Sequence, residues 1–122
     1  MTMEEVREIL EAKVLIGGDR MEEPVETACG SDLMSDVLAF VKDKTVLITG
    51  LINPHVVRTS EMLDITCIVF SRGKMPSQEI LEEAEECGIT VMSTEMTTYT
   101  ACGELYLHGL PGTKKRAGAE GA

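Results

Sequence analysis

Residues 45–73 constrain the fold more than any other stretch, because they combine two apolar runs with a helical pattern between them. Residues 45–49 and 65–70 are short, rich in β-branched side chains and nearly free of charge, which is typical of strands buried on both faces. Asn53 followed by Pro54 predicts a helix start, since asparagine caps free N–H groups and proline fits the first helical position. Two buried strands joined by a helix predict a parallel βαβ unit with a right-handed crossover.

The same alternation continues downstream. The sequence predicts a helix over residues 76–87, a strand over residues 89–93 and a further helix over residues 94–108. The last of these gathers three larger side chains on one face: Tyr99, Cys102 and Tyr106. The three strands are expected to be adjacent and parallel in one sheet, with Cys67 buried in the middle one.

Upstream of this core the sequence predicts one helix and two short strands. Thr2 and Glu5 form a T-x-x-E capping box, which predicts a helix over residues 3–12. Residues 14–16 and 25–28 predict short strands, which we expect to form a small hairpin-like pair. The predicted fold class is therefore α/β, a mainly parallel βαβαβα sheet with an N-terminal helix and a small strand pair.

A polar stretch over residues 29–36 precedes another predicted helix that ends near Lys42. Ser31 suits the N-cap and Asp32 the first turn of that helix, whereas capping does not explain the polar residues that follow. The stretch is either a polar wall for a ligand or partner, with Cys29 as a thiol near a helix N-terminus, or a solvated helix start.

Length and charge indicate one domain with few classes of partner. Residues 1–110 are expected to form the domain, and the Gly/Ala-rich residues 111–122, which carry a basic triplet, a disordered tail. The formal net charge is −10. A chain that acidic repels phosphate backbones and anionic lipid, so nucleic acid and membrane surfaces are poor partners.

Neither a membrane span, a secretory leader nor a catalytic or metal site is predicted. No apolar run reaches about 18 residues, and the N-terminus is Glu-rich, so a cytoplasmic location is expected. The four cysteines form no C-x-x-C pair and have no histidine at ligand spacing, so no metal or other cofactor is expected. His55 and His108 have no evident nucleophile beside them, and the chain is not expected to be an enzyme.

The loops at the carboxyl ends of the predicted strands form a candidate ligand site. In open parallel sheets ligands bind at this edge, where helix N-termini favour an anion. Arg72 and Lys74, two of the few cations of this region, lie in one of these loops. The predicted site for an anionic ligand such as a phosphorylated molecule consists of five residues: Gly50, Asn53, Arg72, Gly73 and Thr94.

Three stretches resemble the DRTGG domain family, most closely its single-domain clostridial-type members. They are ACGSDLMSDVLAFV at residues 28–41, VLITGLINPHVVRTSEMLDI at residues 46–65 and ILEEAEECGITVMST at residues 80–94. The family is named for a D-R element and a T-G-G element after successive core strands. This chain lacks the D-R pair, and Ser71-Arg72-Gly73 matches only the final glycine of the second element.

The resemblance implies an α/β fold similar to the N-terminal domain of HPr kinase, a homodimer, and a role in sensing or docking. It also implies an adenine nucleotide as one ligand class. Two functions remain open. The first is a non-catalytic regulatory domain that senses a small anionic ligand, phosphorylated or a nucleotide. The alternative is a protein docking or dimerisation module without a small-molecule ligand, working through residues 31–36 or the acidic helix over residues 77–87.

Overall fold

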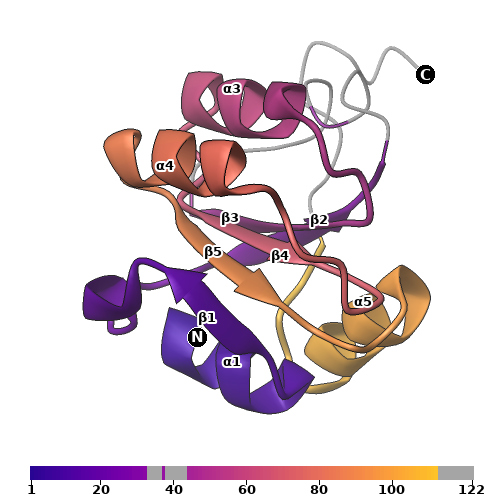
Figure 1. The fold of residues 1–122 in the computed structure, drawn as a ribbon. Helices are drawn as coiled ribbons and strands as arrows, with labels where there is room; N and C mark the ends of the chain where they lie inside the picture. The colour runs from indigo at the N-terminus through magenta and orange to yellow at the C-terminus, as the bar shows by residue number, and fades with distance from the viewer. Residues whose placement is uncertain (33–36, 38–43, 113–122) are drawn as a thin grey trace, which may run out of the picture.

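The computed structural model describes residues 1–32, 37 and 44–112. The strands are β1 (Lys13–Ile16), β2 (Thr27–Gly30), β3 (Thr45–Thr49), β4 (Cys67–Phe70) and β5 (Thr90–Ser93). The helices are α1 (Met3–Leu10), α3 (Pro54–Met62), α4 (Gln78–Glu86) and α5 (Thr98–Leu107). The sheet has the order β1-β5-β4-β3-β2, with α3 and α4 on one face and α1 and α5 on the other (Figure 1). Most of the helix predicted to end near Lys42, like residues 113–122, lies outside the described residues.

The three central strands confirm the predicted core. β3, β4 and β5 are adjacent and parallel, and every residue in them is buried. β4 begins two residues later than predicted. The N–H of Ile65 donates to the carbonyl of Ser60 at 2.9 Å, so Ile65 still belongs to the turn that ends α3. Asn53 caps α3 as expected, with its side chain accepting from the N–H of His55 at 2.9 Å.

Alternation along the central strands divides the core into two layers. Val46, Ile48 and Val69 pack in the cluster shared with α1 and α5. Leu47 and Ile68 pack in the cluster shared with α3 and α4. Cys67 is fully buried, as predicted. Successive strand residues point to opposite faces, so a sheet covered on both sides needs apolar residues at every position.

The predicted pairing of the two short upstream strands is wrong. β1 and β2 lie at opposite edges of the sheet, where β1 pairs antiparallel with β5 and β2 pairs parallel with β3. After a 3₁₀ turn over Gly18–Arg20, the chain binds back to its own N-terminus instead of turning into a hairpin. The N–H of Glu4 donates to Met21, and the N–H of Val25 donates to Met1. These bonds carry the segment to the far edge.

Both terminal helices are shorter than predicted, and α1 ends at Leu10 instead of residue 12. The Thr2–Glu5 capping box of α1 is confirmed. α5 begins at Thr98 with Thr97 as its N-cap, four residues later than predicted. Its core-facing residues are Ala101 and Leu105, which are fully buried. The face that carries Tyr99 and Tyr106 points outward, with Cys102 half-buried at its margin.

The C-terminal residues of the described chain cover the outer edge of β2. The N–H of Ala28 donates to the carbonyl of Pro111 at 2.9 Å, and Gly112 forms a parallel bridge with Ala28. Both residues lie beyond the predicted domain boundary at Leu110. Among the described helices, none has the length and apolar character needed to span a membrane.

We expect Ile68→Ala to lower the free energy of unfolding by about 2–5 kcal/mol, because it opens a cavity at a fully buried position. Met62→Ala is the control, since Met62 is 74% exposed, and should change stability by less than about 0.5 kcal/mol. Urea unfolding followed by circular dichroism measures both. Equal losses in the two variants would contradict the assigned core.

Burial raises the pKa of the Cys67 thiol to about 12. A cysteine thiol in the unfolded chain has a pKa of about 8.5. Between that pH and the pKa of the folded chain, the unfolded chain releases a proton that the folded chain keeps. The free energy of unfolding should therefore fall as pH rises, by up to about 1.4 kcal/mol per pH unit from this thiol. Urea unfolding at pH 8, 9 and 10 should show a flatter slope for Cys67→Ala. Parallel slopes would contradict the prediction.

Candidate functional site

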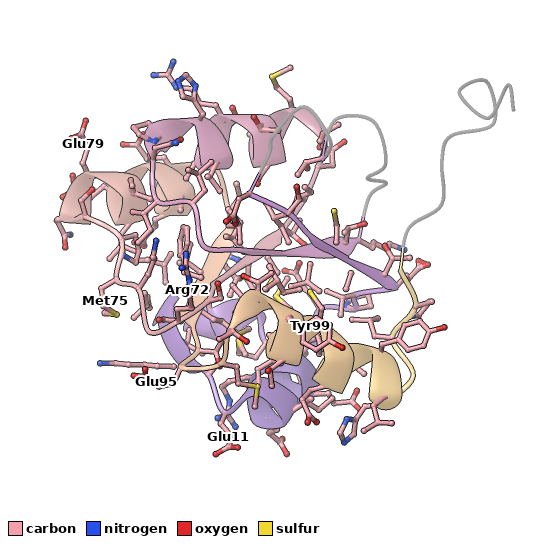
Figure 2. All side chains as sticks on the ribbon, turned by 90° about the vertical axis from the view of Figure 1, so that its right-hand side faces the viewer. Glu11, Arg72, Met75, Glu79, Glu95 and Tyr99 are labelled. Carbon is pink, nitrogen blue, oxygen red and sulfur yellow. The ribbon has the colours of Figure 1, made fainter. Side chains whose placement is uncertain are left out.

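The carboxyl ends of β3, β4 and β5 lie at one edge of the sheet, and the loops that leave them carry the predicted site residues. Figure 2 shows Arg72 and Glu95 on these loops and Tyr99 on α5. Because every residue of the three strands is buried, this edge is where their polar groups become accessible.

The backbone of Gly50, the residue that follows β3, is hydrogen-bonded through both its N–H and its C=O group. The N–H of Gly50 donates to Oδ1 of Asp32 at 2.7 Å. The carbonyl of Gly50 accepts from Nζ of Lys74 at 2.9 Å. The hydroxyl of Thr49 donates to the same Asp32 oxygen at 2.9 Å. The N–H of Gly50, a residue of the predicted anion site, is therefore already bonded to a carboxylate of the chain itself.

Residues 71–74 form a tight turn directly after β4. Arg72 and Gly73 have φ values of 60° and 66°, and the N–H of the fourth residue donates to the carbonyl of the first at 3.2 Å. This is the pattern of a type I′ turn, in which a non-glycine residue is uncommon. The N–H groups of Arg72 and Gly73 donate to the carbonyls of Met96 and Thr94, both at 2.7 Å. The loop after β5 thus fixes the left-handed backbone of Arg72.

The side chain of Arg72 lies over Gly50. A Cβ added to Gly50 would be 2.5 Å from Nη2 of Arg72 and 3.3 Å from Oγ of Ser71. Glycine at this position lets the guanidinium approach the backbone. Arg72 is exposed, and within the described ranges its guanidinium makes no ion pair. The structure therefore brings Gly50, Arg72 and Gly73 to one edge, as the sequence suggested.

The other two predicted residues have structural roles. Asn53 accepts the His55 N–H as the cap of α3. Thr94 is 1% exposed, and its hydroxyl donates to the carbonyl of Leu10 at 2.7 Å. Thr94 does not begin α5, contrary to the predicted helix over residues 94–108, because the N-cap is Thr97. Its side chain points away from solvent and towards α1.

The helix N-termini at this edge are capped by their own residues. Asn53, Ser77 and Thr97 accept from the first turns of α3, α4 and α5. In α3 the first residue is Pro54, which has no N–H to offer. The caps bind some of the free N–H groups at each helix N-terminus. The positive charge at this edge therefore comes chiefly from Arg72 and Lys74.

A hollow of about 270 Å³ lies beside the turn. Its lining combines two carboxylates, one ammonium group and smaller side chains: Glu11, Lys13, Gly73, Met75, Ser93, Thr94 and Glu95. Oε2 of Glu95 lies against the backbone of Gly73. The sequence did not single out Glu95, and it placed Asp32 in the polar stretch over residues 29–36 without a contact to Gly50. Neither contact can be predicted from the local sequence, because each depends on how loops far apart in the sequence meet.

Three thiols have a raised pKa, which keeps them protonated. Burial raises that of Cys67 to about 12, and burial also raises that of Cys102. A hydrogen bond with Glu61, followed by burial, raises the pKa of Cys87 to about 11. A protonated thiol is a poor nucleophile, so these three cysteines are not primed for covalent chemistry. Among the described residues, no three His, Cys, Asp or Glu side chains gather in a way that would hold a metal ion.

The chain was compared with known families, curated proteins and solved structures. The DRTGG domain model matches residues 5–107. No curated protein matches the chain. A similar solved structure is that of the CBS and DRTGG domains of the regulatory region of Clostridium perfringens pyrophosphatase, complexed with the activator diadenosine tetraphosphate.

That structure has a TM-score of 0.68 and 20% sequence identity, and the match covers 95% of this chain and 51% of that chain. At this identity the likeness shows the fold, and this chain spans about half the length of the pyrophosphatase fragment. The family model covers most of the sequence, from the first turn of α1 to the end of α5. The chain belongs to the DRTGG domain family.

Proposed function

We propose that this protein is a non-catalytic regulatory domain that senses a small anionic ligand at the edge around Arg72. The ligand classes are a phosphorylated metabolite and an adenine nucleotide. Gly50 lets the Arg72 guanidinium lie against the backbone, Gly73 gives the turn its left-handed conformation, and Arg72 supplies the charge. Asn53 and Thr94 support the loops that hold this arrangement.

One observation carries this proposal: Arg72 differs from the other described arginines. Arg7, Arg20 and Arg58 each lie 3.9 Å or less from a carboxylate, whereas Arg72 makes no ion pair within the described residues. A guanidinium presents paired donors whose geometry matches phosphate and carboxylate oxygens. In a chain with a net charge of −10, an arginine without a carboxylate partner is a natural acceptor for an external anion.

The ligand class is supported by the similar regulatory region. That protein was crystallised with diadenosine tetraphosphate, which its description names as an activator. We carry over only the chemical class, an anionic phosphorylated compound. The hollow beside Gly73 is lined by Glu11, Lys13 and Glu95, so a part of the ligand that enters it should carry hydrogen-bond donors rather than a further phosphate.

A second candidate function is a docking or dimerisation module, with the protein acting as a homodimer. The observation that favours it is the outer surface of α5, where two tyrosines and a leucine are exposed. This candidate needs no small-molecule ligand. The two candidates concern different surfaces and can be tested separately.

A ligand present at about 100 times its dissociation constant should stabilise the protein by about 2.7 kcal/mol. We expect a thermal-shift response to a panel of phosphometabolites and adenine nucleotides. Arg72→Ala should weaken binding by about 1.5–3 kcal/mol, because it removes a charge-assisted hydrogen bond. Calorimetric titration with the responding compound measures this loss.

Arg58→Ala is the matched control, since its 72% exposed side chain lies on α3 beside Glu83. It removes the same charge and should leave affinity nearly unchanged. Equal binding by Arg72→Ala and the parent would reject the placement of the site. No response to any compound of the panel would favour the docking module.

Asp32→Asn should tighten binding of the same ligand by a few-fold, because it removes a negative charge while keeping an oxygen for the Gly50 N–H. Salt should reduce this gain, since screening weakens charge repulsion. Titrations at low and at physiological ionic strength measure both effects. Weaker binding by Asp32→Asn would show that Asp32 helps to hold the ligand.

A further inference from the structure

We infer that the ligand carries hydrogen-bond donors close to its phosphate, either hydroxyl groups or an ammonium group, and that the Glu95 carboxylate accepts from them. The inference rests on the proposed function, because it takes the anion at Arg72 as given. Three features of the described chain carry it: the positions of two opposite charges, the lining of the hollow beside them and the backbone conformation on both sides of that hollow.

Two side chains of opposite charge lie over glycines that follow neighbouring strands. The Arg72 guanidinium lies over Gly50, after β3, with Nη2 2.5 Å from the position of an added Cβ. The Glu95 carboxylate lies over Gly73, after β4, with Cδ and Oε1 3.0 and 3.1 Å from such an atom. A side chain at either glycine would displace the charged group. The two glycines therefore leave room for one positive and one negative charge at this edge.

Arg72 and Glu95 do not neutralise each other. Both side chains are exposed, and within the described ranges neither belongs to an ion pair. β3 and β4 are hydrogen-bonded neighbours, and the backbones of such strands lie about 4.8 Å apart. One small molecule at this edge can therefore reach both charges. Such a molecule needs an anion for the guanidinium and hydrogen-bond donors for the carboxylate.

The hollow beside the turn after β4 continues this negative charge away from Arg72. Two carboxylates, of Glu11 and Glu95, line it together with the single ammonium group of Lys13. A second hollow, of about 170 Å³, shares Glu11, Thr94 and Glu95 with the first, so the two hollows adjoin. Figure 2 shows Glu95 between Arg72 and Glu11 along this side of the molecule. The excess of carboxylate suits hydrogen-bond donors and disfavours a second phosphate.

Charged residues with a left-handed backbone border the hollow on both sides. Glu11 and Arg72 have φ values of 51° and 60°, and they are two of the four non-glycine residues with positive φ in the described chain. Glycine adopts this conformation far more readily than other residues do. Non-glycine residues held in it cost free energy and gather at functional sites. Charged side chains in this conformation on both sides of the hollow support a ligand contact there.

Together these features favour phosphate esters with a hydroxyl or an amine a few atoms from the phosphate. The phosphate accepts from the Arg72 guanidinium, and the donor group lies against the Glu95 carboxylate. Ribose phosphates, including nucleotides, supply hydroxyl donors, and phosphorylated amines supply an ammonium group. A phosphate ester without donors uses only the positive half of the site.

Three probes of equal size test the inference: ethyl phosphate, 2-hydroxyethyl phosphate and phosphoethanolamine. They differ only in the terminal group, which is a methyl, a hydroxyl or an ammonium group. Titration of the full chain, followed by NMR chemical shifts, measures each affinity. At least one donor probe should bind at least about fivefold more tightly than ethyl phosphate, because it gains a hydrogen bond to a charged group that is exposed to solvent. The tighter of the two identifies the donor as a hydroxyl or an amine.

Glu95→Gln should bind the three probes within about twofold of one another, because an amide oxygen is a weaker acceptor than a carboxylate. Glu86→Gln is the matched control, since it removes the same charge from an exposed residue of α4 and should keep the wild-type preference. Arg72→Ala should weaken binding of all three probes, because each carries the phosphate.

Equal affinities of the three probes for the wild type would overturn the inference, and so would an unchanged preference in Glu95→Gln. Either result leaves the anion site standing as long as Arg72→Ala still weakens binding. A wild type that binds none of the probes, or an Arg72→Ala variant that binds them like the wild type, would overturn the proposed function together with the inference.

Discussion

Burial of β3, β4 and β5 on both faces is the constraint on which the rest of the structure depends. These strands offer solvent no polar side chain along their length, so polar interactions concentrate where the strands end. Asp32 accepts from the N–H of Gly50 and Lys74 donates to its C=O at that edge. The same bonds tie the end of β2 and the loop after β4 to the end of β3.

The two proposed working surfaces are connected through one turn. The N–H of Arg72 donates to the carbonyl of Met96, directly before the N-cap of α5. Oγ of Ser71 lies 2.7 Å from Oγ1 of Thr98, in the first turn of that helix. An anion at Arg72 would therefore act on a turn that is bonded to the start of α5. Short hydrogen-bonded connections of this kind are the physical means by which one site biases another.

The sequence was most informative where local pattern alone determines structure. Apolar runs located the central strands, and Asn53, Ser77 and the Thr2–Glu5 box located helix starts. The hairpin prediction failed because strand pairing depends on which sheet edges are free, and bonds from Met1 and Glu4 redirected the chain. The core-facing side of α5 was not predicted, because apolar residues lie on both of its sides and periodicity does not distinguish core from surface there.

The meeting of the loops at the candidate site was predicted for the same reason. Topology places the ends of parallel strands together, so Gly50 and Arg72 were expected to meet, and they do. The roles of Asp32, Glu95 and Thr94 depend on how side chains from distant loops and from α1 pack. No spacing rule contains that information.

Pairing of Pro111 and Gly112 with β2 has a consequence for where the chain can be cut. An uncovered edge strand presents unpaired N–H and C=O groups to other chains and invites edge-to-edge aggregation. A truncation after Leu110 would remove the carbonyl that accepts the Ala28 N–H and expose this edge. The contacts that cover β2 therefore include Gly112, and a protein that ends two residues earlier would be more prone to aggregate than its small loss of contacts suggests.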